Sequence, residues 1–446
     1  MRFAPLLLAS TLGAQPVLTL PAALREAEQT SFQAEKARLD AAMAGEGTAL
    51  ARSRYLPELT ARGGHLSLDH TRELVSPAMT LGPFPVLGTL HVPSSGIGVA
   101  SDSSWRYQLG LQYVLYDFGR RSGALSAALS REAATAAAGK AEVQRGQVAV
   151  AERYMTLLDA KARRRVLALR RTALQDHLKT VQDMLQQGMV ARNDSLRTEV
   201  ALRGVEDAQG AVDTAYGNAL EALNVALGRE PHAPAALPED LERPPALPWD
   251  EAAIRRLAAE NNAQVQALRA KVKALDEQTA VRRRDNYPVV VAEAAHSYEQ
   301  NPYLVHPHEN SLFLGLSWKI LDGGARNAQT QESAAQAALA RRELLEAQRS
   351  AEAGAVGALR DFQQSLREMQ TARANVAASE ENLRIVEDQY REGLVRSSEA
   401  LDAEAVLAES RSALDARNYR AYVQQAGLLA LLGEDLAQFY ETHAEK

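Results

Sequence analysis

Hydrophobic residues recur at spacings of three and four over two long stretches of the chain, at about 123–188 and 324–393. In the second stretch the series is Leu359, Phe362, Leu366, Met369, Val376, Leu383, Val386 and Tyr390. A period near 3.5 residues is typical of helices packed as coiled coils. A helix from 123 to 188 would be about 100 Å long at 1.5 Å per residue. The pattern therefore predicts two rods that are too long for one compact domain.

Hydrophobic residues at every second position precede each long stretch. They are Tyr107, Leu109, Leu111, Tyr113 and Leu115 in the first half, and Leu312, Leu314, Leu316, Trp318 and Ile320 in the second. About ten alternating residues with aromatic ends are typical of a tilted transmembrane strand. A soluble hairpin packed on a helix would alternate in the same way, so the pattern alone leaves both interpretations open. Partner strands are expected directly after Pro57 and Pro288.

The prolines mark where long helices are excluded. All 17 lie at or before Pro93, between Pro231 and Pro248, or between Pro288 and Pro307. Because proline inside a helix costs about 3 kcal/mol, the proline-free spans are where the rods are expected.

The two halves of the chain are copies of each other. Gly110, Gly188 and Gly228 each stand in a motif that returns 205 residues later, around Gly315, Gly393 and Gly433. Three motifs at one offset indicate a duplication. The boundaries that we predict are a signal peptide at 1–19, a first repeat at 20–228, a Pro-rich equatorial connector at 229–250, a second repeat at 251–433 and a C-terminal tail at 434–446. Within the repeats, strands are expected at about 56–71, 104–116, 288–299 and 311–320, and long helices at about 122–187, 194–227, 326–391 and 398–432.

Composition narrows the class of protein. The net charge is −6 and no basic face is concentrated enough for nucleic acid. There is no cysteine, which excludes disulfides and thiolate chemistry. Residues from Met1 to about Ala14 have one basic residue and then an apolar run, as in an export signal. No later segment has the roughly 20 apolar residues of a membrane helix, so any bilayer crossing would need strands.

Several motifs together resemble the TolC-like outer membrane factors over nearly the whole chain. They are Tyr116–Arg120 and Leu321–Arg326 at the strand-to-helix junctions, Tyr390–Gly393 with Ala400–Ala403, and Leu431–Gly433. The junction residues are Asp117, Gly119, Arg120, Asp322, Gly324 and Arg326. The resemblance implies a mainly α fold that forms a homotrimer, with a 12-stranded transmembrane β-barrel above a periplasmic α-helical coiled-coil barrel. It also implies an exit duct in the outer membrane, with a periplasmic adaptor and an inner-membrane transporter as partners and no cofactor.

The resemblance also suggests a periplasmic gate. Asp194 and Tyr390 resemble the family's latch pair, whereas the family's latch arginine corresponds to Val395, with Arg396 next to it. Glu399 and Asp402 stand where the family has its constriction acids. Acids such as Asp194 and Glu399 are also favoured in the first turn of any helix, which leaves a purely structural role open.

Two turns resemble the family's docking points for an adaptor. They contain Gly188, Met189 and Val190 in the first repeat, and Gly393, Leu394 and Val395 in the second. Each glycine is also the expected C-cap of its helix.

Histidines and arginines cluster at a few other places in the chain. His306 and His308 lack a third ligand, so no metal site is predicted. Arginines at 120, 121, 282–284 and 326 lie where strands meet helices, which suggests either contact with lipid phosphates or a solvated collar.

Two other classes of protein fit the sequence less well. A periplasmic coiled-coil adaptor or scaffold that never enters the membrane is the main alternative, although an adaptor normally has one helical hairpin rather than two. An enzyme is not predicted, because the sequence has no phosphate-binding loop, nucleophile elbow or zinc-binding helix motif.

Overall fold

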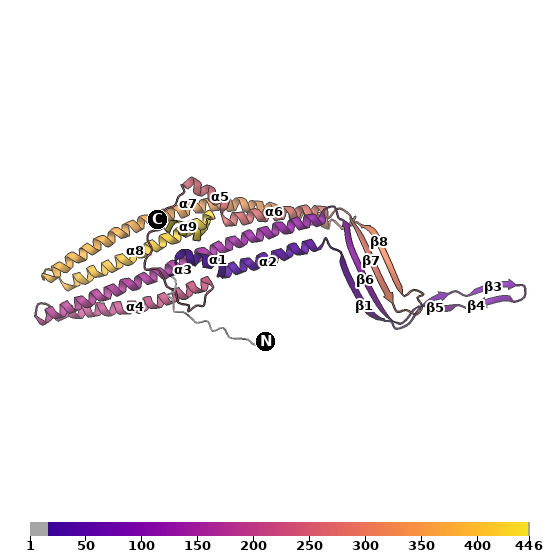
Figure 1. Cartoon of the computed structure of the whole chain (residues 1–446), viewed down its shortest axis with the longest axis horizontal. Helices are drawn as coiled ribbons and strands as arrows, with labels where there is room; N and C mark the ends of the chain where they lie inside the picture. Colours follow the sequence, from indigo (N-terminus) through magenta and orange to yellow (C-terminus); the bar gives the residue numbers. More distant parts are fainter. Residues whose placement is uncertain (1–16, 445–446) are drawn as a thin grey trace, which may run out of the picture. The chain divides into compact units, whose positions relative to one another are not determined.

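The computed structural model describes residues 17–444, and Figure 1 labels its helices and strands. The predicted signal segment lies largely outside these residues. In chain order the elements are α1 (Leu20–Thr30), α2 (Phe32–Ser53), β1 (Glu58–Ser67), β2 (Arg72–Ser76), β3 (Met79–Phe84), β4 (Gly88–Val92), β5 (Ser95–Ala100), β6 (Ser103–Tyr116), α3 (Arg120–Gln186), α4 (Arg192–Leu227), α5 (Glu251–Asn261), α6 (Ala263–Arg284), β7 (Val289–Glu299), β8 (His308–Ser317), α7 (Ala325–Arg391), α8 (Ser397–Leu432) and α9 (Leu436–Ala444).

The order of elements repeats. Helices α4 and α8 end at Leu227 and Leu432, which are 205 residues apart, whereas α1 and α5 begin at Leu20 and Glu251, 231 residues apart. The difference of 26 residues lies between β1 and β6, where the first repeat has the additional strands β2–β5. The mainly helical fold with a small β part, predicted from the sequence, is confirmed.

The long helices coincide with the proline-free spans. Helices α3 and α7 each contain 67 residues, about 100 Å at 1.5 Å per residue, and every long helix ends within two residues of its predicted bounds. The C-cap residues of helices α4 and α8 are Gly228 and Gly433, both with φ near +74°. A Cβ at Gly228 would lie 2.2 Å from the carbonyl oxygen of Thr30, so both backbone conformation and space require glycine there.

The chain forms two compact units, and each takes segments from both repeats. Within the described residues, the helical unit comprises 17–43, 133–272 and 340–444, and the sheet unit comprises 44–132 and 273–339. The sequence repeats are therefore not separate units in space.

The core of the helical unit includes both ends of the described chain. Leu18 is only 7% exposed, and its carbonyl oxygen accepts a hydrogen bond from the Tyr154 hydroxyl at 2.7 Å. Leu436 and Tyr440 of α9 are also buried in this core. Two predictions therefore need correction. Residues from Leu18 onward belong to the folded protein rather than to a signal peptide at 1–19, and most of the predicted tail at 434–446 is a packed helix.

The Pro-rich connector is held in the helical unit by hydrogen bonds to its backbone. Lys161 donates to the carbonyl oxygens of Leu237 and Pro238 at 3.0 and 2.8 Å. Gln425 donates to the carbonyl oxygen of Pro245 at 2.6 Å. Helix side chains thus satisfy backbone groups that an irregular segment leaves unpaired.

The sheet unit contains a four-stranded antiparallel sheet with the order β1-β6-β7-β8. Two further strand pairs, β2–β5 and β3–β4, extend the connection between β1 and β6 (Figure 1). Strand β8 ends at Ser317, so Trp318 and Ile320, which were predicted to continue the strand, lie beyond it. None of the helices in residues 17–444 combines the length and the low charge needed to cross a bilayer.

Candidate functional site

One face of the four-stranded sheet is apolar and exposed. Alternation along β1, β6 and β8 places leucines on this face, and their side chains are 40–83% exposed. They are Leu59, Leu109, Leu111, Leu312, Leu314 and Leu316. Since no described element covers them, this face is available for a lipid or protein environment.

The opposite face of the sheet is polar. Arg106 forms an ion pair with Glu299 at 2.8 Å across β6 and β7, and Gln112 donates to Glu293 at 3.1 Å. Arg62 lies on the same face, opposite Gln108. Paired charges on one face and leucines on the other match the alternation that is typical of transmembrane strands.

Aromatic side chains border the apolar face at one end. The rings of Trp105 and Tyr107 stack with centroids 6.4 Å apart, and Tyr107 stacks on Tyr298 at 5.8 Å. His65 and His308 continue this row at 5.0 Å from Trp105 and 4.8 Å from Tyr298. The row crosses all four strands.

A second aromatic group lies at the other end of the sheet. Phe118 contacts Tyr116 and Tyr287 at centroid distances of 4.8 and 5.5 Å. Trp318 donates its indole N–H to the carbonyl oxygen of Asn286 at 3.0 Å. Aromatic rings with polar tips at both ends of an apolar band are typical of membrane interfaces.

The two predicted strand-to-helix motifs have the same geometry. Asp117 accepts from the backbone N–H of Gly119 and from the guanidinium of Arg121, at 3.2 and 3.0 Å. Asp322 accepts in the same way from Gly324 and Arg326, at 3.1 and 2.6 Å. Hydrogen bonding to Arg326 lowers the pKa of Asp322. The counterpart of Arg326 is therefore Arg121, which the sequence motif did not include.

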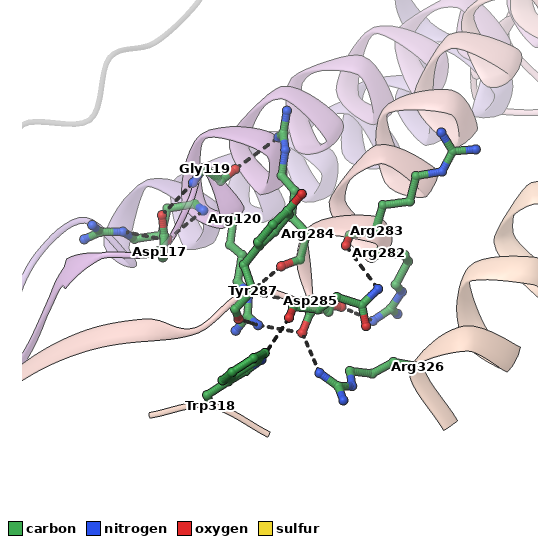
Figure 2. A network of polar contacts seen from close by, with 12 residues as sticks. Asp117, Gly119, Arg120, Arg282, Arg283, Arg284, Asp285, Tyr287, Trp318 and Arg326 are labelled. Atoms are coloured by element: carbon green, nitrogen blue, oxygen red, sulfur yellow. Dashed lines mark hydrogen bonds and ion pairs between the residues drawn. The ribbon is translucent and has the colours of Figure 1, made fainter. Parts of the chain in front are cut away.

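Arg120 has a different role, which Figure 2 shows. It donates to three backbone carbonyl oxygens at the end of α6, those of Arg284, Asp285 and Tyr287, at 3.1, 2.7 and 2.7 Å. The last carbonyl groups of a helix lack partners within the helix, so Arg120 caps α6 from the start of α3. Arg326 adds a hydrogen bond to the carbonyl oxygen of Asp285 at 3.3 Å.

The arginine-rich junction is thus mainly an internal network. Arg284 donates to the carbonyl oxygen of Gly119 at 3.0 Å, and Arg282 lies 3.7 Å from the carboxylate of Asp285. Arg283 is exposed. Backbone carbonyl groups and carboxylates engage the guanidinium groups of most of these arginines, and contact with lipid phosphates or a solvated collar stays a prediction.

The two predicted docking turns lie at the ends of the helical hairpins. Gly188 and Gly393 both have φ of +75°, and nothing lies within 4 Å of a Cβ placed there. The N–H groups of Met189 and Leu394 bond back to the helix carbonyl groups at 2.9 Å. Their side chains are 65% and 70% exposed, so each turn presents one apolar side chain to the surroundings.

The predicted latch residues lie near each other, but they are not bonded. The Tyr390 hydroxyl is buried without a hydrogen-bond partner in the described chain. Burial raises the pKa of Tyr390. The side chain of Ser397 lowers this pKa, and the nearby charge of Asp194 raises it.

A contact that the sequence did not reveal joins the two hairpins instead. His177 of α3 hydrogen-bonds the Ser397 hydroxyl of α8 at 3.0 Å, and its ring lies 5.0 Å from that of Tyr390. Burial lowers the pKa of His177. Neither His177 nor Ser397 belongs to a recognisable motif, and only the spacing of the two hairpins brings them together.

Arg396, Glu399 and Asp402 are exposed at the start of α8. Arg396 is the N-cap residue, and no ion pair of its side chain is found in residues 17–444. Glu399 and Asp402 share an exposed helix face with Val406 and Glu409, at spacings of three and four. Their role in a gate stays a prediction.

The histidines near the sheet do not form a metal centre in the described part of the chain, where no three potential ligands cluster. His308 stacks on His296 at 5.5 Å and belongs to the aromatic row. His306 lines a cavity of about 510 Å³ together with Arg106 and Glu299.

A comparison with protein families matches the outer membrane efflux protein model over residues 23–229 and 254–434. The chain belongs to the outer membrane efflux protein family. The TolC-like assignment made from the sequence is therefore confirmed: this is a non-enzymatic outer-membrane efflux channel. No curated protein is similar enough in sequence to match.

Solved structures share the fold at low sequence identity. A membrane protein from Pseudomonas aeruginosa has 18% identity and a TM-score of 0.72, with 93% of each chain covered. CusC has 16% identity and a TM-score of 0.73, over 94% of this chain and 93% of CusC. The MtrE outer membrane channel of Neisseria gonorrhoeae in its open state has 17% identity and a TM-score of 0.71. The match covers 94% of this chain and 89% of MtrE.

Two neighbouring arginines should respond differently to substitution. Arg284→Gln removes the charged donor to Gly119 and should destabilise the protein by about 1.5–3 kcal/mol. Arg283→Gln should change the free energy of unfolding by no more than about 0.5 kcal/mol, because the side chain of Arg283 is exposed. Thermal unfolding of the purified protein in detergent measures both. A larger loss for Arg283→Gln would contradict the network and favour lipid contact.

His177 should make stability depend on pH. Because burial lowers its folded-state pKa, its contribution is complete above the unfolded value of about 6.5 and is lost as pH falls through the folded value. The thermal midpoint of the wild type should therefore fall more between about pH 7.5 and pH 5 than that of His177→Gln. Gln is a suitable comparison because it retains a donor for Ser397 but does not titrate. Equal pH dependence in both proteins would refute this role of His177.

Proposed function

We propose that three copies of this chain form one exit duct through the outer membrane, with a 12-stranded β-barrel and a helical tunnel. The observation that supports it most is the four-stranded sheet, which has an apolar exposed face, a polar face and two edges without partners. Strands β1 and β8 each have one neighbour in the described chain. Unpaired backbone groups cannot remain exposed in lipid, so the edges require strands from other copies.

The apolar band has the dimensions of a bilayer core. Along β6, Tyr116 is nine positions after Tyr107, which corresponds to about 30 Å at 3.4 Å per residue. With a strand tilt of about 40°, this corresponds to about 23 Å along the membrane normal, close to the roughly 25 Å of transmembrane barrels. The two aromatic groups would then lie at the two interfaces.

The helical hairpins would form the periplasmic part of the duct. In a trimer, Glu399 and Asp402 of three copies would make two rings of negative charge around the lumen, which attract cations and repel anions. Asp194, Tyr390 and Arg396 would belong to the contacts that hold this end closed, together with His177 and Ser397.

The exposed turns would bind the periplasmic adaptor. Met189 and Leu394 offer matching apolar contacts at equivalent positions, so one adaptor hairpin could engage either repeat. An inner-membrane transporter would complete an efflux pump or a type I secretion system. The main alternative, an adaptor that never enters the membrane, is disfavoured by the family membership.

A charge on the apolar face should block membrane assembly. Leu312→Lys places a charge in the middle row of the band, level with Leu111, and should destabilise the inserted protein by about 2–4 kcal/mol. Ser311→Lys, on the polar face of the same strand, should be tolerated. Fractionation and heat-stable oligomers on gels measure both. If both variants reach the outer membrane equally, the proposed orientation of the sheet is wrong.

Neutralising the constriction acids should change ion selectivity. Glu399→Gln with Asp402→Asn should move the reversal potential in a salt gradient toward zero, because the channel loses its preference for cations over anions. Glu392→Gln, an exposed acid outside α8, is the matched control. Planar-bilayer recordings give the reversal potentials. An unchanged value in the double variant would remove these acids from the gate.

A further inference from the structure

The first repeat carries a long ribbon that the second repeat lacks. This ribbon, residues 72–100, consists of the pairs β2–β5 and β3–β4. In the second repeat, only residues 300–307 connect the equivalent strands β7 and β8. The ribbon accounts for the 26 additional residues of the first repeat.

The ribbon has no charge over most of its length. From Leu74 to Ala100 there is no Asp, Glu, Lys or Arg, although 24% of the whole chain is charged. Exposed strand edges normally carry charges that prevent pairing with other chains. An uncharged ribbon of this length therefore has the properties of an interface rather than of a solvated loop.

The two faces of the outer part of the ribbon differ. The pairs Met79–Val92 and Leu81–Leu90 place four apolar side chains on one face. The pair between them, Thr80 and His91, points to the other face and forms a hydrogen bond at 2.9 Å. At the tip of the ribbon, Val86 and Leu87 are 94% and 85% exposed.

The base of the ribbon is braced, whereas its outer part is uncovered. Asn301, only 7% exposed, donates to the carbonyl oxygen of Val99 at 3.2 Å. The ring of Tyr303 packs where a side chain on Gly98 would lie, 2.8 Å from a Cβ built there. Beyond this base, Met79, Leu81 and Leu90 stay 41–56% exposed in the described chain. A two-stranded ribbon alone is at best marginally stable in water, so the outer part needs a partner.

The chemistry of the ribbon favours another copy of the chain over lipid. A segment that lies on a membrane surface typically carries Lys or Arg for the headgroups and Trp or Tyr at the interface. Residues 74–100 contain none of these four residue types. Moreover β1, whose open edge the proposed trimer pairs with a neighbouring copy, leads directly into the ribbon.

We propose that the ribbon packs by its apolar face against the same ribbon of neighbouring copies, beyond the sheet. The inference rests on the proposed trimer and adds a second interface to it. Three ribbons that bury Met79, Leu81, Leu90 and Val92 between them surround the axis of the duct at its outer end.

Cysteine crosslinking tests this interface, because the chain has no native cysteine. Leu90→Cys lies on the apolar face, and His91→Cys is its neighbour on the opposite face. A short bismaleimide applied to outer membranes should link copies of the Leu90→Cys variant. The His91→Cys variant should give no crosslinked product. Equal yields at both positions, or no product at position 90, would overturn the proposal.

Two further measurements separate the possible failures. Native mass spectrometry of Leu90→Cys in detergent gives the number of copies. Three copies without crosslinking would refute the ribbon interface alone, whereas a single copy would refute the proposed duct and the interface together.

A bimane fluorophore on the same cysteine should not be quenched by spin-labelled lipids. Quenching would show that lipid, rather than another copy, covers the ribbon.

Discussion

The unpaired backbone groups along the outer edges of β1 and β8 are the constraint on which the proposed assembly depends. The sheet combines these open edges, which water can hydrogen-bond but lipid cannot, with a face of exposed leucines, which lipid covers favourably but water does not. Placing the leucines in lipid removes the apolar surface from water but makes the open edges more costly. In the proposed duct, pairing of β1 with β8 of another copy satisfies both requirements.

The junctions between strands and helices explain how a thin sheet is held by long helices. At each junction an aspartate binds the backbone and an arginine of the following helix, and the arrangement is repeated in both halves. Arg120 breaks the symmetry, because it caps α6 through three carbonyl groups. The network engages five of the six junction arginines through backbone carbonyl groups or carboxylates, so these side chains contribute to the fold.

Much of the fold could be predicted from the sequence because its signals are local. The absence of proline marks α3 and α7, and alternation marks β6 and β8. Glycines such as Gly188 and Gly433 mark the helix ends, where φ near +75° excludes most other residues.

Other features depend on contacts between distant segments, which no local pattern encodes. His177 and Ser397 are 220 residues apart and carry no motif. The nine residues of α9 are too few to distinguish a helix from a tail by pattern, although Leu436 and Tyr440 complete the core. Leu18 falls within the predicted signal peptide for a similar reason, since an apolar residue after an apolar run does not reveal where folding begins. Local pattern also does not separate the roles of Arg120 and Arg121, because both follow Asp117 closely.

The number of copies in the assembly tests the central claim most directly. Native mass spectrometry of the wild-type protein, extracted from outer membranes in mild detergent, should give the mass of three chains. A mass of one chain, with the sheet edges unpaired, would contradict the account.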